Sequence, residues 1–93
     1  MRRMSMKAIP DAFACMARYL MEDDEASAEL WNKVLLAAKK NGLGNDEEAI
    51  LPAAVESLRV LMRKMKSSQP AKSPAAYFYV VIDRKLKLLK VHF

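Results

Sequence analysis

Side chains that could perform catalysis are few in this sequence of 93 residues. His92 is the only histidine and Cys15 the only cysteine, and His92 stands next to the last residue, a position where chains commonly fray. A nucleophile and its general base must lie within hydrogen-bond reach of each other, so we expect neither a Cys-His nor a Ser-His site. Cys15 is interpreted as a small buried apolar residue on a helix. We therefore expect that the protein is not an enzyme.

Acidic residues gather at 22–25 and at 46–48, where they could in principle bind a cation. Neither cluster has the spaced oxygen ligands and the central glycine of a calcium loop, and acids at the start of a helix are stabilised by the helix dipole. The stretch 42–45 lacks the lysine of a phosphate-binding loop. A single cysteine cannot form a disulfide within the chain or a thiolate metal cluster, which favours a reducing, cytoplasmic location. We expect neither a metal nor another cofactor.

Basic residues concentrate in the second half of the chain. The net charge is +5 overall, but residues 22–48 carry three basic and eight acidic residues, whereas residues 49–93 carry nine basic and two acidic ones. Arg59, Arg63 and Lys66 recur at i, i+4 and i+7, which places them on one helix face. Such a stripe could hold DNA phosphates without recognising sequence, although a solvated helix face has the same composition. The candidate nucleic-acid-binding residues are Arg59, Arg63, Lys64, Lys66, Lys72, Arg84, Lys87 and Lys90.

A second candidate surface is apolar and lies beside or opposite the core face that we predict for the last helix. It consists of Tyr77, Tyr79, Val80 and Val91. Apolar side chains left in water commonly mark a contact with another protein or a second copy. The alternative hypothesis is therefore a protein-interaction or regulatory bundle, able to form a homo-oligomer and without a nucleic-acid role. The longest apolar run, 75–82, is far shorter than the roughly 20 residues of a membrane span, so we expect no membrane insertion.

Apolar periodicity predicts the helices that position these residues. Intervals of three and four predict a helix from about Pro10 to Met21, preceded by a flexible arm over residues 1–7. The next helix has a predicted buried face made of Leu30, Trp31, Val34, Leu35 and Ala38. Gly42 follows it as the left-handed residue that ends a helix.

The third helical segment begins at a cap provided by Asn45 or Asp46 and extends to about Lys66. Pro52 falls inside it, where the ring would clash with a preceding carbonyl and remove one backbone hydrogen bond. We favour a short turn over 46–50 followed by a new helix at Pro52, rather than one kinked helix. The sequence thus predicts four helices, or five if this segment is divided.

The last segment follows a linker over residues 67–72 and starts at Ser73-Pro74, a strong helix start. Its core face would lie within an arc of about 80° and contain Phe78, Ile82, Leu86, Leu89 and Phe93. Asp83 and the nearby basic residues would lie on the solvated far side, while Lys85 would extend out of the apolar arc. The aromatic and β-branched run 77–82 keeps a C-terminal β-hairpin as an alternative. We predict a single all-α domain over residues 1–93.

One stretch resembles a known family. Ser73-Pro74-Ala75-Ala76-Tyr77-Phe78-Tyr79, followed by Val80-Val81-Ile82-Asp83-Arg84-Lys85-Leu86, resembles a segment near the end of replication proteins of Gram-positive plasmids and phages. In that group, a capping Ser or Asn and a Pro open a helix that passes through a Tyr-Phe pair into an apolar and basic stretch. The resemblance covers residues 73–89. It implies a helical module within or beside a replication initiator or helicase-loading factor, with DNA or a replisome protein as partner. The winged-helix domain typical of such initiators has no counterpart in the sequence, so the resemblance does not extend to sequence-specific origin binding.

Overall fold

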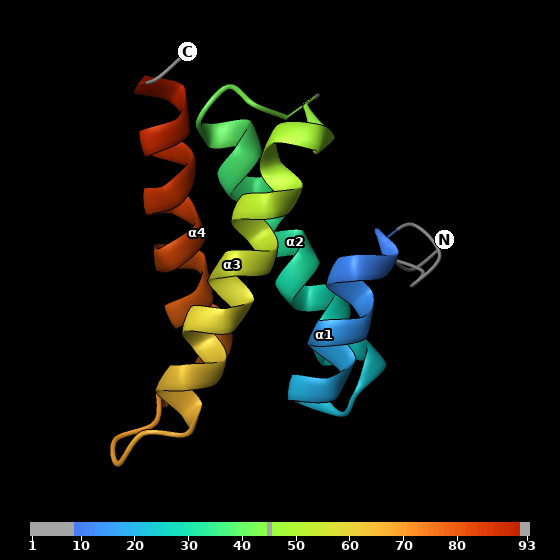
Figure 1. The fold of residues 1–93 in the computed structure, drawn as a ribbon, viewed down its shortest axis with the longest axis vertical. Coiled ribbons are helices and arrows are strands. Elements are labelled where there is room, and N and C mark those ends of the chain that lie inside the picture. Colours follow the sequence, from blue (N-terminus) through green and yellow to red (C-terminus); the bar gives the residue numbers. More distant parts are fainter. Residues whose placement is uncertain (1–8, 45, 92–93) are drawn as a thin grey trace.

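A computed structural model describes residues 9–44 and 46–91, with side chains described as far as residue 89. It contains four helices and, within those ranges, no strand: α1 Asp11–Met21, α2 Asp24–Lys40, α3 Glu47–Met65 and α4 Pro74–Val91. α3 lies between α4 and α1 with α2 behind it (Figure 1), and both α1 and α4 pack against α2 and α3. The predicted all-α bundle is confirmed. The arm predicted at residues 1–7 lies outside the described residues.

Polar side chains cap three of the four helix starts. The capping residues are Asp23, Asp46 and Ser73, whose side-chain oxygens accept hydrogen bonds from the backbone N–H groups of Glu25, Ala49 and Ala76 at 3.1, 3.2 and 3.3 Å. These bonds satisfy N–H groups that have no partner inside the helix. Of the two caps proposed for α3, Asp46 is the one observed, while Asn45 lies outside the described residues. Gly42 has φ 75° and follows α2 as predicted, because a left-handed turn there is open to glycine at little cost.

Pro52 lies inside α3 without dividing it, so the predicted break was wrong. The proline is exposed and removes only one helical hydrogen bond. The buried face of α3 extends across it, from Ile50 through Ala54 to Leu58 and Leu61. A break at the proline would remove Ile50 from this face, and removing a buried isoleucine side chain typically costs about 2 to 5 kcal/mol. The continuous helix therefore keeps more apolar surface buried.

The β-hairpin alternative at the C-terminus was also wrong, because the described residues from 74 to 91 are helical. Phe78, Ile82 and Leu86 are fully buried and lie four residues apart, so one helix face buries all three. Burial of this face against α2 and α3 overrides the strand preference of the aromatic and β-branched residues. Lys85 is half-buried, as predicted, and Phe93 lies outside the described residues.

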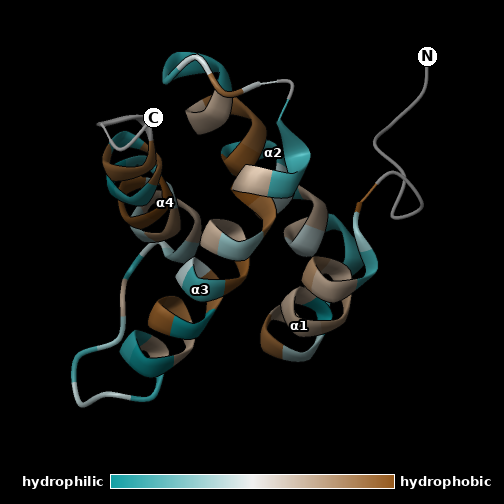
Figure 2. Cartoon of the chain, turned by 45° about the horizontal axis from the view of Figure 1, so that its top comes forward, coloured by the Kyte–Doolittle hydropathy of each residue, from teal (hydrophilic) through white to brown (hydrophobic). Residues whose placement is uncertain are grey.

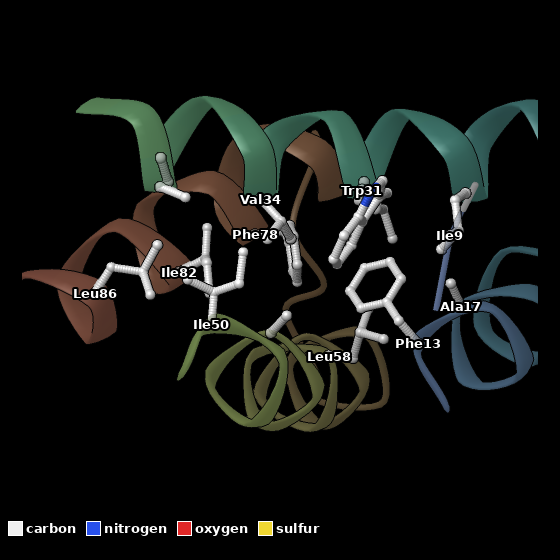
Figure 3. Close-up of a cluster of buried hydrophobic side chains, with 14 of the residues drawn as sticks. Ile9, Phe13, Ala17, Trp31, Val34, Ile50, Leu58, Phe78, Ile82 and Leu86 are labelled. Atoms are coloured by element: carbon white, nitrogen blue, oxygen red, sulfur yellow. The ribbon is translucent and has the colours of Figure 1, made fainter. Parts of the chain in front are cut away.

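Three aromatic rings from three helices meet in the core, as Figure 3 shows. Phe13 of α1 lies 5.0 Å from Trp31 of α2 and 6.0 Å from Phe78 of α4, measured between ring centroids. The rings are inclined to one another by 59° and 64°, and such tilted pairs are more favourable than face-to-face stacks. In Figure 2 each helix carries both hydrophobic and hydrophilic residues, whereas the loop between α3 and α4 is largely hydrophilic.

Two residues predicted to be buried are exposed. Cys15 follows Phe13 by two residues, about 200° around the helix, and therefore lies on the solvent side of α1. Leu35 directly follows the fully buried Val34, about 100° away, and remains 38% exposed. In α1 and in α2, the buried face thus contains fewer residues than the apolar pattern of the sequence predicts.

Candidate nucleic-acid interface

The outer face of α3 carries an exposed row of cations, Arg59 and Arg63, which Lys66 continues at the C-cap of the helix; the three are called here the α3 basic row. These residues point away from the core because the opposite face of α3 contains its buried side chains. Arg59 Nη1 lies 3.9 Å from Glu56 Oε1, and an exposed pair at that distance has little energetic weight. Within the described part of the chain, no ion pair engages Arg63 or Lys66. The row thus keeps its positive charge toward solvent.

Two further candidate cations lie beside the loop that joins α3 to α4. Lys64 and Lys72 line a depression of about 690 Å³ together with Tyr77. The Lys64 Nζ atom lies 5.9 Å from the centroid of the Tyr77 ring, close enough for a cation–π interaction. Lys64 therefore contributes to the contact between α3 and α4, whereas Lys72 is exposed on the loop.

The candidate cations of α4 are in a different environment. Lys87 Nζ lies 3.3 Å from Asp83 Oδ2, and Lys40 Nζ of α2 lies 3.6 Å from the same oxygen. Arg84 is exposed on α4, while the side chain of Lys90 lies outside the described residues. The structure therefore keeps Arg59, Arg63 and Lys66 together but draws Lys87 to the contact between α2 and α4.

Asp83 of α4 lies in a different environment from the predicted one. It was predicted on the solvated side of α4, yet it is 9% exposed. We call Lys40, Asn41, Asp83 and Lys87 the Asp83 cluster. Asn41 Nδ2 donates to Asp83 Oδ1 at 2.9 Å and to the Ala37 carbonyl at 2.8 Å. Because Asn41 is 42 residues away in sequence, no local pattern on α4 indicated this burial.

The hydrogen bond from Asn41 holds the pKa of Asp83 below its ordinary value of 3.8, and the two lysines act in the same direction. Burial alone would raise the pKa, since it disfavours the charged form. The net direction is downward, so the carboxylate stays ionised at neutral pH. The cluster joins the end of α2 to the middle of α4, which is a structural role.

The candidate partner surface on α4 is only partly available. Tyr77 and Tyr79 are half-buried and pack against the core, and Lys40 Nζ lies 6.0 Å from the Tyr79 ring centroid. Val80 is 51% exposed, while the side chain of Val91 lies outside the described residues. Leu88 was missed by sequence reasoning, although it is 62% exposed. The apolar residues that α4 leaves in solvent are thus valine and leucine rather than tyrosine.

Other kinds of site have little support in residues 9–44 and 46–91. No three His, Cys, Asp or Glu side chains in these ranges are placed to hold a metal ion. Over the same ranges, none of the helices is both long enough and apolar enough to span a membrane.

Similarity to known proteins adds no family to these observations. No protein-family model matches the chain, and neither a curated protein nor a solved structure is significantly similar to it.

Proposed function

We propose that the chain is a non-catalytic helical module of a replication-associated protein and that it contacts DNA through the α3 basic row. The observation that carries this proposal is the row itself: three exposed cations at the C-terminal end of α3, of which Arg59 alone has an ion-pair partner, Glu56, among the described residues. The replication context rests on the resemblance of residues 73–89, which span the cap and most of α4.

The length of the row suits a phosphate backbone. Arg59 and Lys66 are seven residues apart, about 10 Å along the helix axis, and one DNA strand places a phosphate about every 3.4 Å of duplex axis. The row can therefore contact two or three phosphates, which gives affinity without base recognition. Glu47 and Glu48 at the opposite end of α3 would repel DNA. Contact is thus confined to the C-terminal half of the helix.

Fluorescence anisotropy with labelled duplex and single-stranded oligonucleotides at low salt tests this proposal. The informative variant is the double substitution Arg63→Gln/Lys66→Gln. We expect weaker binding to every sequence, and a salt dependence whose slope falls by about 1.8 on duplex DNA, since each lost phosphate contact removes about 0.9.

A matched control removes the same charge elsewhere, with Lys33→Gln and Lys39→Gln on α2, neither of which is a candidate DNA-binding residue. We expect the control to retain most of the affinity. Equal losses in the two variants would show that net charge alone governs binding and would contradict the proposed surface. Undetectable binding of the unaltered protein at low salt would remove the DNA proposal altogether.

The exposure of Val80 and Leu88 favours a second candidate, a protein-interaction or regulatory module that uses the outer face of α4. Exposed apolar side chains on one helix are a common feature of protein contacts. Sedimentation velocity over a range of concentrations, with Val80→Ser/Leu88→Ser as the variant, tests whether this face mediates association. An unchanged association state in the variant would count against self-association through α4.

A further inference from the structure

The outer face of α2 also leaves apolar side chains in solvent. Leu35 is 38% and Leu36 55% exposed, and neither belongs to the core cluster. They line an open depression of about 430 Å³ with four polar residues: Glu29, Asn32, Lys33 and Lys39. Within the described part of the chain, no ion pair engages Glu29 or Lys39. Along α2, the two leucines therefore lie between Glu29 and Lys33 on the N-terminal side and Lys39 on the C-terminal side.

Charge changes sign along α2. Its first half carries Glu25 and Glu29 at exposed positions, whereas its second half carries Lys33 and Lys39. Asp24 and Lys40 are already paired, with Arg18 at 3.1 Å and with Asp83 at 3.6 Å. A second α2 in antiparallel orientation would place each acidic half against a basic half. A parallel copy would instead oppose like charges. The helix is therefore electrostatically complementary to itself in one orientation only.

The spacing of the charged residues fits a two-fold axis. Glu29 and Lys39 lie five residues before and after position 34, which is about 7.5 Å in each direction along the helix. An axis at that level would place Glu29 of each copy opposite Lys39 of the other copy. Leu35 and Leu36, one and two residues from the same level, would then meet their counterparts close to the axis.

We propose that the outer face of α2 is a homodimer interface, formed by two antiparallel copies of this helix around a two-fold axis. Such an interface presents the same surface from both subunits, so it closes at two copies. Two leucines on each side form a small apolar centre, and small interfaces are typical of weak, transient association. The dimer is therefore concentration-dependent.

The α4 surface is less suited to self-association. Val80 and Leu88 are accompanied on its exposed face by Arg84 and Lys87, and no exposed acid of α4 among the described residues offsets them, because Asp83 is buried. Two copies of this face would bring cations together. The α2 proposal is thus independent of both candidate functions given above.

Sedimentation equilibrium in reducing buffer tests the interface. The unaltered chain should pass from monomer to dimer as its concentration rises, and Leu36→Glu should remain monomeric at concentrations where the unaltered chain dimerises. Val80→Glu on α4 is the matched control, because it places the same charge at a similarly exposed apolar position. Far-UV circular dichroism establishes that each variant is folded. A monomer at millimolar concentration, or dimerisation lost in Val80→Glu but kept in Leu36→Glu, would overturn the proposal.

Charge exchange tests the antiparallel register. Glu29→Lys and Lys39→Glu should each weaken self-association, because each creates two like-charge pairs across the axis. A mixture of the two variants should form a heterodimer about tenfold tighter than either homodimer, since both opposing pairs are then of opposite sign. A parallel dimer would give a different result, because there Glu29→Lys alone would not weaken association. A mixture no tighter than its components would exclude the proposed register.

Discussion

The α3 basic row and the lysines of the Asp83 cluster have the same kind of side chain in different surroundings. In the row, the closest carboxylate is an exposed Glu56 oxygen 3.9 Å from Arg59. In the cluster, Lys40 and Lys87 converge from two helices on one buried carboxylate at 3.6 and 3.3 Å. The cations of the row are open to an external anion such as a phosphate. The lysines of the cluster already contact an anion of the protein itself, the Asp83 carboxylate. Availability of a cation for binding is therefore determined by the neighbouring helix as well as by spacing along its own helix.

Among substitutions that distinguish the α3 basic row from the Asp83 cluster, Asp83→Ala should have the largest effect on stability. This change leaves the Ala37 carbonyl as the one remaining hydrogen-bond acceptor of the buried Asn41 amide. It also removes the carboxylate that lies between Lys40 and Lys87. We expect the free energy of unfolding to fall by about 1 to 3 kcal/mol, measured by urea denaturation. Arg63→Ala is the control and should change stability by less than about 0.5 kcal/mol. Equal effects of the two substitutions would remove the distinction between row and cluster.

The pH dependence of stability also distinguishes the Asp83 cluster from the α3 basic row. The pKa of Asp83 lies lower in the folded protein than its ordinary value of 3.8, so the unfolded chain binds more protons between the two values. The stabilisation by this carboxylate is then complete above about pH 4 and is lost as the pH falls toward the folded pKa. Asp83→Asn should therefore show a shallower loss of stability below pH 4 than the unaltered protein. Parallel stability curves for the two proteins would contradict the lowered pKa.

The smallest effect concerns single lysines. Lys87→Ala removes an i, i+4 pair with Asp83 whose lysine side chain is 57% exposed, so we expect a loss of only about 0.5 kcal/mol. Lys66→Ala in the α3 basic row should leave stability unchanged but weaken oligonucleotide binding. Thermal unfolding should detect only the Lys87→Ala change, and fluorescence anisotropy with an oligonucleotide should detect only the Lys66→Ala change. Identical patterns would mean that both lysines play the same role.

Helix ends were predictable from the sequence because their causes are local. Asp46, Ser73 and Gly42 act on backbone groups within a few residues, and all three do what their residue types predict. The α3 basic row was predictable for the same reason, since its spacing lies within one helix. Features whose interacting groups are neighbours along the chain were thus predictable.

The features that were not predicted depend on contacts between distant segments. Burial of Asp83 requires Asn41 and Lys40 of α2, and the continuity of α3 through Pro52 depends on packing of Ile50 in the shared core. The exposure of Cys15 is different in kind, because its position opposite Phe13 on α1 follows from helical periodicity alone. The general preference of cysteine for burial does not outweigh that geometry.

Trp31 makes unfolding of the aromatic core observable by fluorescence. It is the only tryptophan in the chain, is 3% exposed and lies 5.0 Å from Phe13. Indole emission moves to longer wavelength when the ring enters water, so unfolding should shift the fluorescence maximum. Oligonucleotide contact on α3 or association through the outer face of α2 leaves this ring enclosed. One intrinsic fluorophore thus reports on unfolding separately from events at the surface.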